Sequence, residues 1–174
     1  ASGNTIKVSA GSATWSSVIT LPSSKDLTIT GAGIATTVIT CTANPCFRIP
    51  NSRTYVISGF EFVGNSGFIL HRVDAPVIGK YHRIHHNKFI KTGGGYGSID
   101  IMGEPVTNCS ETTPVHPTVL YDNNQFVDVR IDVNGTACSW ADGNAQHRLW
   151  AQNPRPNSPT GAWPFIVYVE DNIF

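Results

Sequence analysis

The sequence has few charged side chains and no excess of either sign. Asp, Glu, Lys and Arg make up 14% of its 174 residues, against about 25% in typical soluble domains, and 12 basic residues balance 12 acidic ones. The chain has neither a basic stripe nor a polybasic cluster, so it lacks the electrostatic footprint of proteins that bind nucleic acid or anionic lipid. We therefore expect no nucleic-acid partner.

Long apolar runs and helical periodicity are also missing. The longest apolar runs are a few residues, which is too short to span a membrane. No window shows the sustained i, i+3, i+4, i+7 spacing of an amphipathic helix. The apolar share of 40% nevertheless excludes intrinsic disorder, and the length fits a single domain over residues 1–174.

Cysteine is scarce but even in number. The four are Cys41, Cys46, Cys109 and Cys138. The Thr-Ala-Asn-Pro spacer between Cys41 and Cys46 is turn-like and could close a small loop, and Cys109 and Cys138 would then pair across a longer one. Four reduced thiols are the alternative, whereas a zinc site is disfavoured because neither pair has the C-x2-C spacing.

The N-terminus and two sequons favour an extracellular setting. Residues 1–4 contain neither a charged n-region nor an apolar h-region, as expected of a mature start. Asn108 and Asn134 open Asn-x-Ser/Thr tripeptides that permit glycosylation. Together with the paired cysteines, these features predict a secreted or cell-surface protein.

Short alternating segments recur along the chain and resemble one another. Their shared form is apolar, any, apolar, polar, small or polar, Asn, any, Phe; the first two copies lack the Asn, and the first also lacks the Phe. The segments are Leu27–Gly31, Tyr55–Phe62, His82–Phe89, Val119–Phe126 and Val167–Phe174. Their anchors, 28, 27, 37 and 48 positions apart, are Ile29, Ile57, Ile84, Tyr121 and Val169. A period in the twenties with insertions is typical of a solenoid.

Stacking these units in register predicts an all-β parallel β-helix, favoured over a β-sandwich because the copies agree in order. Equivalent residues of successive coils then lie about 4.8 Å apart, so like residues form ladders. The expected internal aromatic stack is Phe62, Phe89, Phe126 and Phe174. The expected ladder in a tight turn is Asn87, Asn124 and Asn172. A second strand is expected after each Phe, as in Gly67–His71, Gly97–Met102 and Val129–Val133.

The two ends and one insertion complete the predicted organisation. Residues 1–20 are assigned to an N-terminal cap or first strand. Residues 134–163, rich in Pro, Asn and Trp, are assigned to a long lateral loop. Phe174 directly follows the last ladder unit, and solenoids need polar end caps, so we expect the N-terminal part of a longer β-helix.

The segment His82–Phe89, followed by Gly93-Gly-Gly-Tyr-Gly and a strand, resembles the secreted right-handed parallel β-helix proteins of the pectate-lyase-like superfamily. It is most similar to the alginate lyase and chondroitinase B type. The segment Tyr168–Phe174 also resembles bacterial surface β-helix repeats of no assigned activity. The resemblance covers roughly residues 20–174. It implies a fold far more than a function, because many chemistries share these repeats.

One candidate site lies on the first strand of each unit. If the anchors point inward, the residues that follow them point outward, which places Asp122 and Glu170 on adjacent coils, about 5 Å apart at the backbone. Two carboxylates this close bind a cation such as Ca²⁺ or share a proton, and they also resemble a retaining glycosidase pair. A solvated polar ladder beside the turn is the alternative.

A second candidate site lies on the strand after the Phe. There Asp100 and Asp132 would stack, with Arg130 beside them and His71 and Arg72 one coil below. A polysaccharide lyase needs a positive group or Ca²⁺ to neutralise a uronate and a base to take its C5 proton. The resemblance implies these roles for this strand, and Arg130 would be the base. Surface charges on an open sheet face are the alternative.

A locally basic and aromatic region could hold an acidic glycan, although a variable turn is the competing explanation. Its residues are Lys80, Arg83, His85 and Lys88. His82 is expected to face inward, and His85 and His86 are expected to point in different directions, so no metal site is predicted among them. Lys88 is expected to pair with Glu61. Trp140 could wall a glycan groove or cover the apolar flank of a coil.

Two functions follow from these patterns. The first is a secreted carbohydrate-active protein, most plausibly a lyase that cleaves a uronic-acid polymer by β-elimination. The second is a non-catalytic surface or matrix scaffold, for which self-association through an open solenoid end is conceivable. Hydrolysis through either carboxylate pair ranks third.

Overall fold

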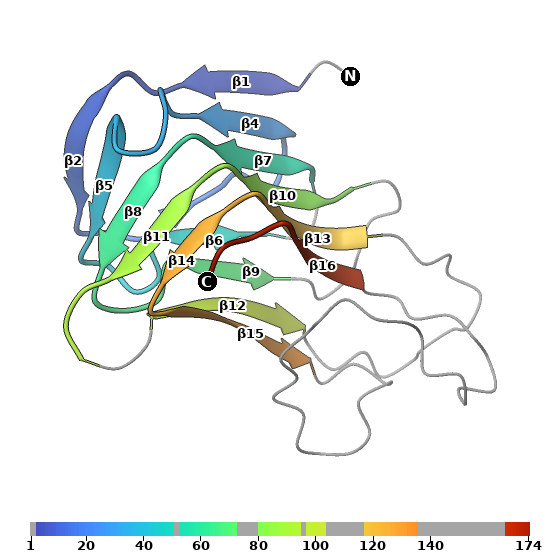
Figure 1. The fold of residues 1–174 in the computed structure, drawn as a ribbon. Coiled ribbons are helices and arrows are strands. Elements are labelled where there is room, and N and C mark those ends of the chain that lie inside the picture. The colour runs from blue at the N-terminus through green and yellow to red at the C-terminus, as the bar shows by residue number, and fades with distance from the viewer. Residues whose placement is uncertain (1–2, 51–52, 73–79, 95–96, 104–116, 136–165) are drawn as a thin grey trace, which may run out of the picture.

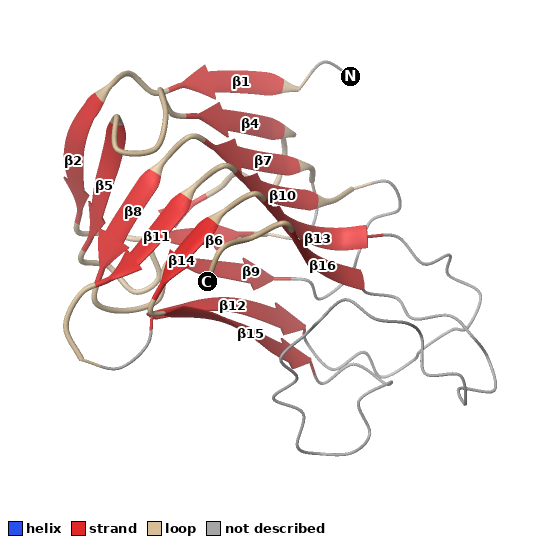
Figure 2. Ribbon diagram, in the orientation of Figure 1, coloured by secondary structure: helices blue, strands red, loops and turns tan. Residues whose placement is uncertain are grey.

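The structure is a computed structural model that describes residues 3–50, 53–72, 80–94, 97–103, 117–135 and 166–174. These residues form sixteen β-strands and no helix (Figure 2). Accordingly, this part of the chain contains no helix that could cross a membrane.

The strands form three sheets, and each coil of the chain contributes one strand to each sheet in turn (Figure 1). Sheet A contains β1 (Asn4–Lys7), β4 (Leu27–Thr30), β7 (Tyr55–Ser58), β10 (His82–His85), β13 (Pro117–Asp122) and β16 (Ile166–Glu170). Sheet B contains β2 (Gly11–Trp15), β5 (Thr37–Cys41), β8 (Glu61–Gly64), β11 (Lys88–Lys91) and β14 (Gln125–Val127). Sheet C contains β3 (Ile19–Thr20), β6 (Phe47–Ile49), β9 (Ile69–Arg72), β12 (Gly97–Gly103) and β15 (Val129–Gly135). Neighbouring strands are parallel in all three sheets, which confirms the predicted parallel β-helix.

The repeat has three strands per coil, whereas the sequence pattern predicted two. The segment Tyr55–Phe62 consists of β7 and β8, and only Gly59 and Phe60 separate them. A turn of two residues is too short to show the composition of a loop, so the pattern merged the two strands into one. The strand predicted after each Phe is therefore the third of its coil and lies in sheet C. Residues 4–20, assigned to a cap or first strand, form the whole first coil, β1 to β3.

The predicted aromatic stack runs along the inner face of sheet B. Phe62 and Phe89 stack with ring centroids 5.2 Å apart, and Phe89 and Phe126 stack at 5.4 Å. Phe174 continues the stack on Phe126 at 5.0 Å. Parallel in-register pairing places one ring directly above the next, and three of the four rings are almost completely buried. Phe62, Phe89 and Phe126 belong to the hydrophobic core, whereas Phe174 is exposed.

The predicted asparagine ladder closes the two-residue turns between sheets A and B. The backbone N–H and the side-chain Nδ2 of Asn87 both donate to Asn124 Oδ1, at 3.0 and 3.2 Å. Asn124 donates in the same way to Asn172 Oδ1, at 2.8 and 3.0 Å. Each ladder amide satisfies buried backbone groups that would otherwise lack partners, because a turn breaks the sheet hydrogen bonds.

Coils without the asparagine close the same turn with glycine. Gly59 has φ of +77°, a left-handed conformation that glycine adopts readily. A Cβ on Gly31 would lie 2.3 Å from the carbonyl oxygen of Gly59, so the two chains approach too closely for a side chain. Phe60 takes the place of the ladder residue in this coil, and its backbone N–H donates to Asn87 Oδ1 at 3.1 Å.

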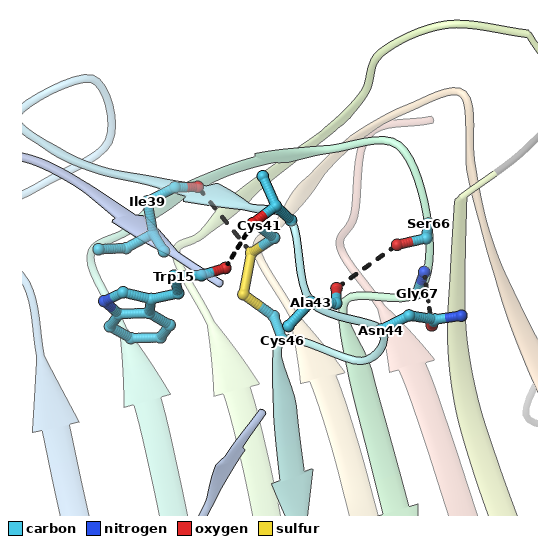
Figure 3. The surroundings of a disulfide bond; sticks show 9 residues. Trp15, Ile39, Cys41, Ala43, Asn44, Cys46, Ser66 and Gly67 are labelled. Carbon is cyan, nitrogen blue, oxygen red and sulfur yellow. Dashed lines mark hydrogen bonds between the residues drawn. A yellow bond between two sulfur atoms is a disulfide. The ribbon is translucent and has the colours of Figure 1, made fainter. Parts of the chain in front are cut away.

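The structure contains the Cys41–Cys46 disulfide, as one of the sequence alternatives predicted (Figure 3). It closes the corner between β5 and β6, and this corner is also bound to the next coil. Asn44 Oδ1 accepts the backbone N–H of Gly67 at 3.1 Å, and Ser66 Oγ donates to the carbonyl of Ala43 at 3.4 Å. Cys109, Cys138, the sequon residue Asn108 and most of the predicted loop at 134–163 lie outside the described residues.

Candidate functional site

The outer face of sheet C carries the acidic and basic residues that the sequence pattern placed together. In the register of β12 and β15, Asp100 lies opposite Asp132 and Ser98 lies opposite Arg130. Ile99 points into the core between the two outward residues of β12, as strand alternation requires. The predicted stacking of Asp100 and Asp132 on adjacent coils, with Arg130 beside them, is therefore confirmed.

These residues form a small charged cluster. Arg130 Nε donates to Asp132 Oδ2 at 2.7 Å, although the Arg130 side chain remains 57% exposed. Ser98 Oγ donates to Asp100 Oδ2 at 3.0 Å. Burial raises the pKa of the half-buried Asp100 carboxyl, and the negative charge of Asp132 raises it further; the Ser98 hydrogen bond and the charge of Arg130 act in the opposite direction. Asp100 therefore binds a proton more readily than an ordinary aspartate.

His71 does not belong to this outer face, contrary to the prediction. It lies opposite Ile101 in the register of β9 and β12, so its ring points into the core, where it is completely buried. The alternation should have been counted from the inward Ile69 of the same strand, which places the residue two positions later inside as well. Arg72 ends β9 and lies opposite Met102.

A buried polar network, which was not predicted from the sequence, surrounds this histidine. His71 Nδ1 meets His82 Nδ1 at 2.9 Å, and His71 Nε2 is hydrogen-bonded to the Tyr121 hydroxyl. His82 Nε2 lies 3.0 Å from the carbonyl oxygen of Pro50. The signal in the sequence was the alternation of inward and outward residues along each strand. It placed His82 and Tyr121 inside, but His71 was assigned to the outer face.

The partners fix the position of every proton in this network. The Pro50 carbonyl only accepts, so His82 carries its proton on Nε2 and presents an unprotonated Nδ1. His71 must then donate from Nδ1, which leaves its Nε2 to accept the Tyr121 hydroxyl. The network is satisfied when both imidazoles are neutral. A second proton on His82 would set two N–H groups against each other.

Burial maintains this neutral state. Burial lowers the pKa of His71 well below its usual value, and the neighbouring His82 lowers it further. Burial also lowers the pKa of His82 to about 4, although its hydrogen bond to Pro50 acts in the opposite direction. Burial raises the pKa of Tyr121, and the negative charge of Asp100 raises it further.

The second predicted carboxylate pair lies on the outer face of sheet A. Asp122 is opposite Glu170 in the register of β13 and β16, as predicted. However, Arg83 takes both oxygens of Asp122, at 3.0 and 2.7 Å, and Asn123 Nδ2 donates to it at 3.2 Å. The Arg83 hydrogen bond lowers the pKa of Asp122. A cation or a shared proton at this pair would have to displace the guanidinium.

His85 and His86 point toward each other, which overturns the expectation that they diverge. Their Nδ1 atoms are 2.8 Å apart at the end of β10. The sequence analysis applied strand alternation to both residues, but His86 has φ of 53° and belongs to the turn. Burial lowers the pKa of His85, the charges of Arg83 and His86 lower it further, and Asp122 raises it.

The other basic residues of the predicted glycan-binding region are already paired. Lys80 Nζ donates to Asp26 Oδ2 at 2.7 Å. Lys88 Nζ lies 3.9 Å from Glu61 Oε2, which confirms the predicted pair. Trp140 lies outside the described residues. The described part of the chain therefore presents no continuous basic patch, and the sheet C cluster is the candidate site.

Metal ligands are sparse among the residues that the structure describes. They contain no group of three or more His, Cys, Asp or Glu side chains placed to hold an ion together.

Comparison with known proteins adds no assignment. No protein-family model matches the sequence, no curated protein matches it, and no solved structure matches the fold. The parallel β-helix is therefore established by the strand pairing of this chain alone.

Proposed function

We propose that this protein is a secreted carbohydrate-active β-helix protein that cleaves a uronic-acid polysaccharide by β-elimination on the outer face of sheet C. The observation that carries the proposal is the Asp100, Asp132 and Arg130 cluster. It combines a carboxylate of raised proton affinity with a guanidinium on the adjacent coil. The Cys41–Cys46 disulfide is consistent with an oxidising compartment.

Each residue has a distinct role in this proposal. Arg130 uses its Nε–H for Asp132, and its terminal N–H groups have the planar fork that binds a carboxylate. It neutralises the uronate, which acidifies the C5 proton. This role suits Arg130 better than that of the base, the role first expected for it, because the charged guanidinium has no acceptor for a proton.

Asp100 is the base. It takes the C5 proton, the electron pair of the C5–H bond forms the C4–C5 double bond, and the C4–O bond breaks. The glycosidic oxygen leaves with a proton from solvent. Asp132 holds Arg130 in position and raises the proton affinity of Asp100 through its charge. Ca²⁺ could assist by binding the uronate together with Asp132.

The test is absorbance at about 235 nm, where the unsaturated product absorbs, with polygalacturonate, alginate, glucuronan and chondroitin and with or without Ca²⁺. We expect a rise with one polymer and a loss of at least about 100-fold in kcat for Asp100→Asn, the range of a general base. Arg83→Gln is the matched control because it breaks the corresponding Arg–Asp pair on sheet A. No product with any polymer would overturn the proposal.

Hydrolysis is the second candidate, because Asp100 and Asp132 are register neighbours, about 5 Å apart at the backbone, and one of them has a raised pKa. This arrangement matches the acid and nucleophile of a retaining glycosidase. New reducing ends without absorbance at about 235 nm would identify it. Binding of a polymer without cleavage would instead support the non-catalytic scaffold.

A further inference from the structure

The exposed histidine pair at the end of β10 has the geometry of a metal chelate. His85 lies opposite Ser58 and Asp122 in the register of sheet A, and His86 is the first residue of the turn. The left-handed conformation of His86 brings its ring to the same side as that of His85. The two Nδ1 atoms are consequently 2.8 Å apart, with the rings at 86° to each other.

A separation of 2.8 Å is that of an N–H···N hydrogen bond, and it also fits one coordination geometry. With metal–nitrogen bonds of about 2.0 Å, two nitrogens at 90° around an ion lie about 2.8 Å apart, whereas tetrahedral ligands lie about 3.3 Å apart. A 90° angle is that of a square-planar or tetragonal ion, and Cu²⁺ is the divalent ion that combines this geometry with the highest affinity for imidazole. We propose that His85 and His86 form a bidentate Cu²⁺ site through their Nδ1 atoms.

The protons of this pair can rearrange to admit an ion. Without metal, one Nδ1 donates its proton to the lone pair of the other. Cu²⁺ needs both lone pairs, so the proton of the donor ring must move to its own Nε2, which solvent allows because His86 is exposed and His85 is only half-buried. Both rings stay neutral, and no proton is lost overall.

The charges next to this pair are mixed. Asp122 lies opposite His85 in the register of sheet A, but both of its oxygens bind Arg83. The contact between the two Nδ1 atoms, and not the surrounding charge, therefore carries the proposal. Among the residues that the structure describes, no third His, Cys, Asp or Glu side chain joins the pair to form a metal-binding group, so that part of the chain supplies two ligands to the proposed site.

The test is titration of the full chain with Cu²⁺ alone, by calorimetry and by electron paramagnetic resonance. His86→Asn and His85→Ser remove one ligand each and copy adjacent coils: Asn123 has the same left-handed turn conformation, and Ser58 occupies the register position of His85. Even the loss of an outer-shell partner costs about 10–100-fold in metal affinity, so each variant should raise the Kd at least about tenfold and remove the two-nitrogen tetragonal signal.

His147→Asn is the matched control, because it removes a histidine that is no part of the pair. We expect its Cu²⁺ affinity to equal that of the wild type. Wild-type affinity in His86→Asn would overturn the proposal, and so would an equal loss in His147→Asn, since binding would then follow histidine content. Unchanged melting temperatures of the two site variants would separate loss of ligand from loss of fold.

Discussion

Two histidine pairs in this protein have nearly the same Nδ1–Nδ1 distance but differ in ring arrangement and chemistry: the buried rings are stacked at 22°, and the surface rings lie at 86° to each other. His71 and His82 meet through Nδ1 atoms 2.9 Å apart in the core, and His85 and His86 meet through Nδ1 atoms 2.8 Å apart at the surface. In the buried pair, the Tyr121 hydroxyl and the Pro50 carbonyl fix every proton. In the surface pair, water can exchange the protons. The Nδ1–Nδ1 contact is thus part of the core structure in the buried pair and a proposed set of metal ligands in the surface pair.

The largest expected effect is the loss of the buried pair. His71→Ala would remove a completely buried ring and leave His82 Nδ1 and the Tyr121 hydroxyl without partners. Cavity formation and unsatisfied polar groups together are expected to lower the free energy of unfolding by about 3–5 kcal/mol. Urea denaturation measures this change. The equivalent substitution His85→Ala should cost less than about 0.5 kcal/mol, and equal losses at the two positions would contradict the comparison.

The second effect is a dependence of stability on pH. His82 has a pKa of about 4 in the folded protein and about 6.5 when unfolded, so the unfolded chain holds more protons between these values. The free energy of unfolding should therefore fall as pH decreases below about 6.5 and level off below about 4. The difference in pKa corresponds to about 3 kcal/mol for His82, and His71 adds to it.

Chemical denaturation at a series of pH values measures this dependence. His82→Phe should reduce the slope between about pH 6.5 and 4, because one of the two buried imidazoles that resist protonation is gone. Carboxylates also titrate at the lower end of this range, so the informative quantity is the difference between the two curves. Identical slopes would show that the buried histidines are not the groups responsible.

A smaller effect on stability is expected when one hydrogen bond of the buried network is removed and the packing is kept. Tyr121→Phe keeps the ring and its packing but removes the hydroxyl that donates to His71 Nε2. An unsatisfied buried acceptor costs about 1–3 kcal/mol, which thermal and urea unfolding can resolve. A cost near zero would mean that His71 finds another donor and that the proton positions derived above are wrong.

The smallest expected effect is that of substituting the surface pair. Combining His85→Ser and His86→Asn should change the free energy of unfolding by less than about 0.5 kcal/mol at neutral pH, because exposed side chains contribute little. The double variant should lose only the part of the pH slope that comes from His85, whose pKa partial burial lowers, and keep the part that comes from the buried pair. A slope flatter in this variant than in His82→Phe would assign the acid sensitivity to the surface pair instead.

The sheet C cluster was predictable because repeat register alone places it. Once Ile99 and Ile131 are assigned as inward residues of adjacent coils, Asp100 and Asp132 must share the outer face. The partner with which each charged side chain pairs was not predictable in the same way. Arg130 could pair with either aspartate, and Asp122 could face Glu170 or Arg83. These choices depend on rotamers and distances that the register does not fix.

The sequence by itself determined the coil, the Phe stack and the Asn ladder. Parallel in-register strands place like residues on like residues, and the repeat shows which residues are equivalent. Only the tertiary structure decided that each coil has three strands and that His85 meets His86. The physical reason is the same in both cases. A two-residue turn, or a single residue in the left-handed conformation, changes which of the following side chains face inward. The residue types of the segment stay the same, so only the folded backbone shows where this change occurs.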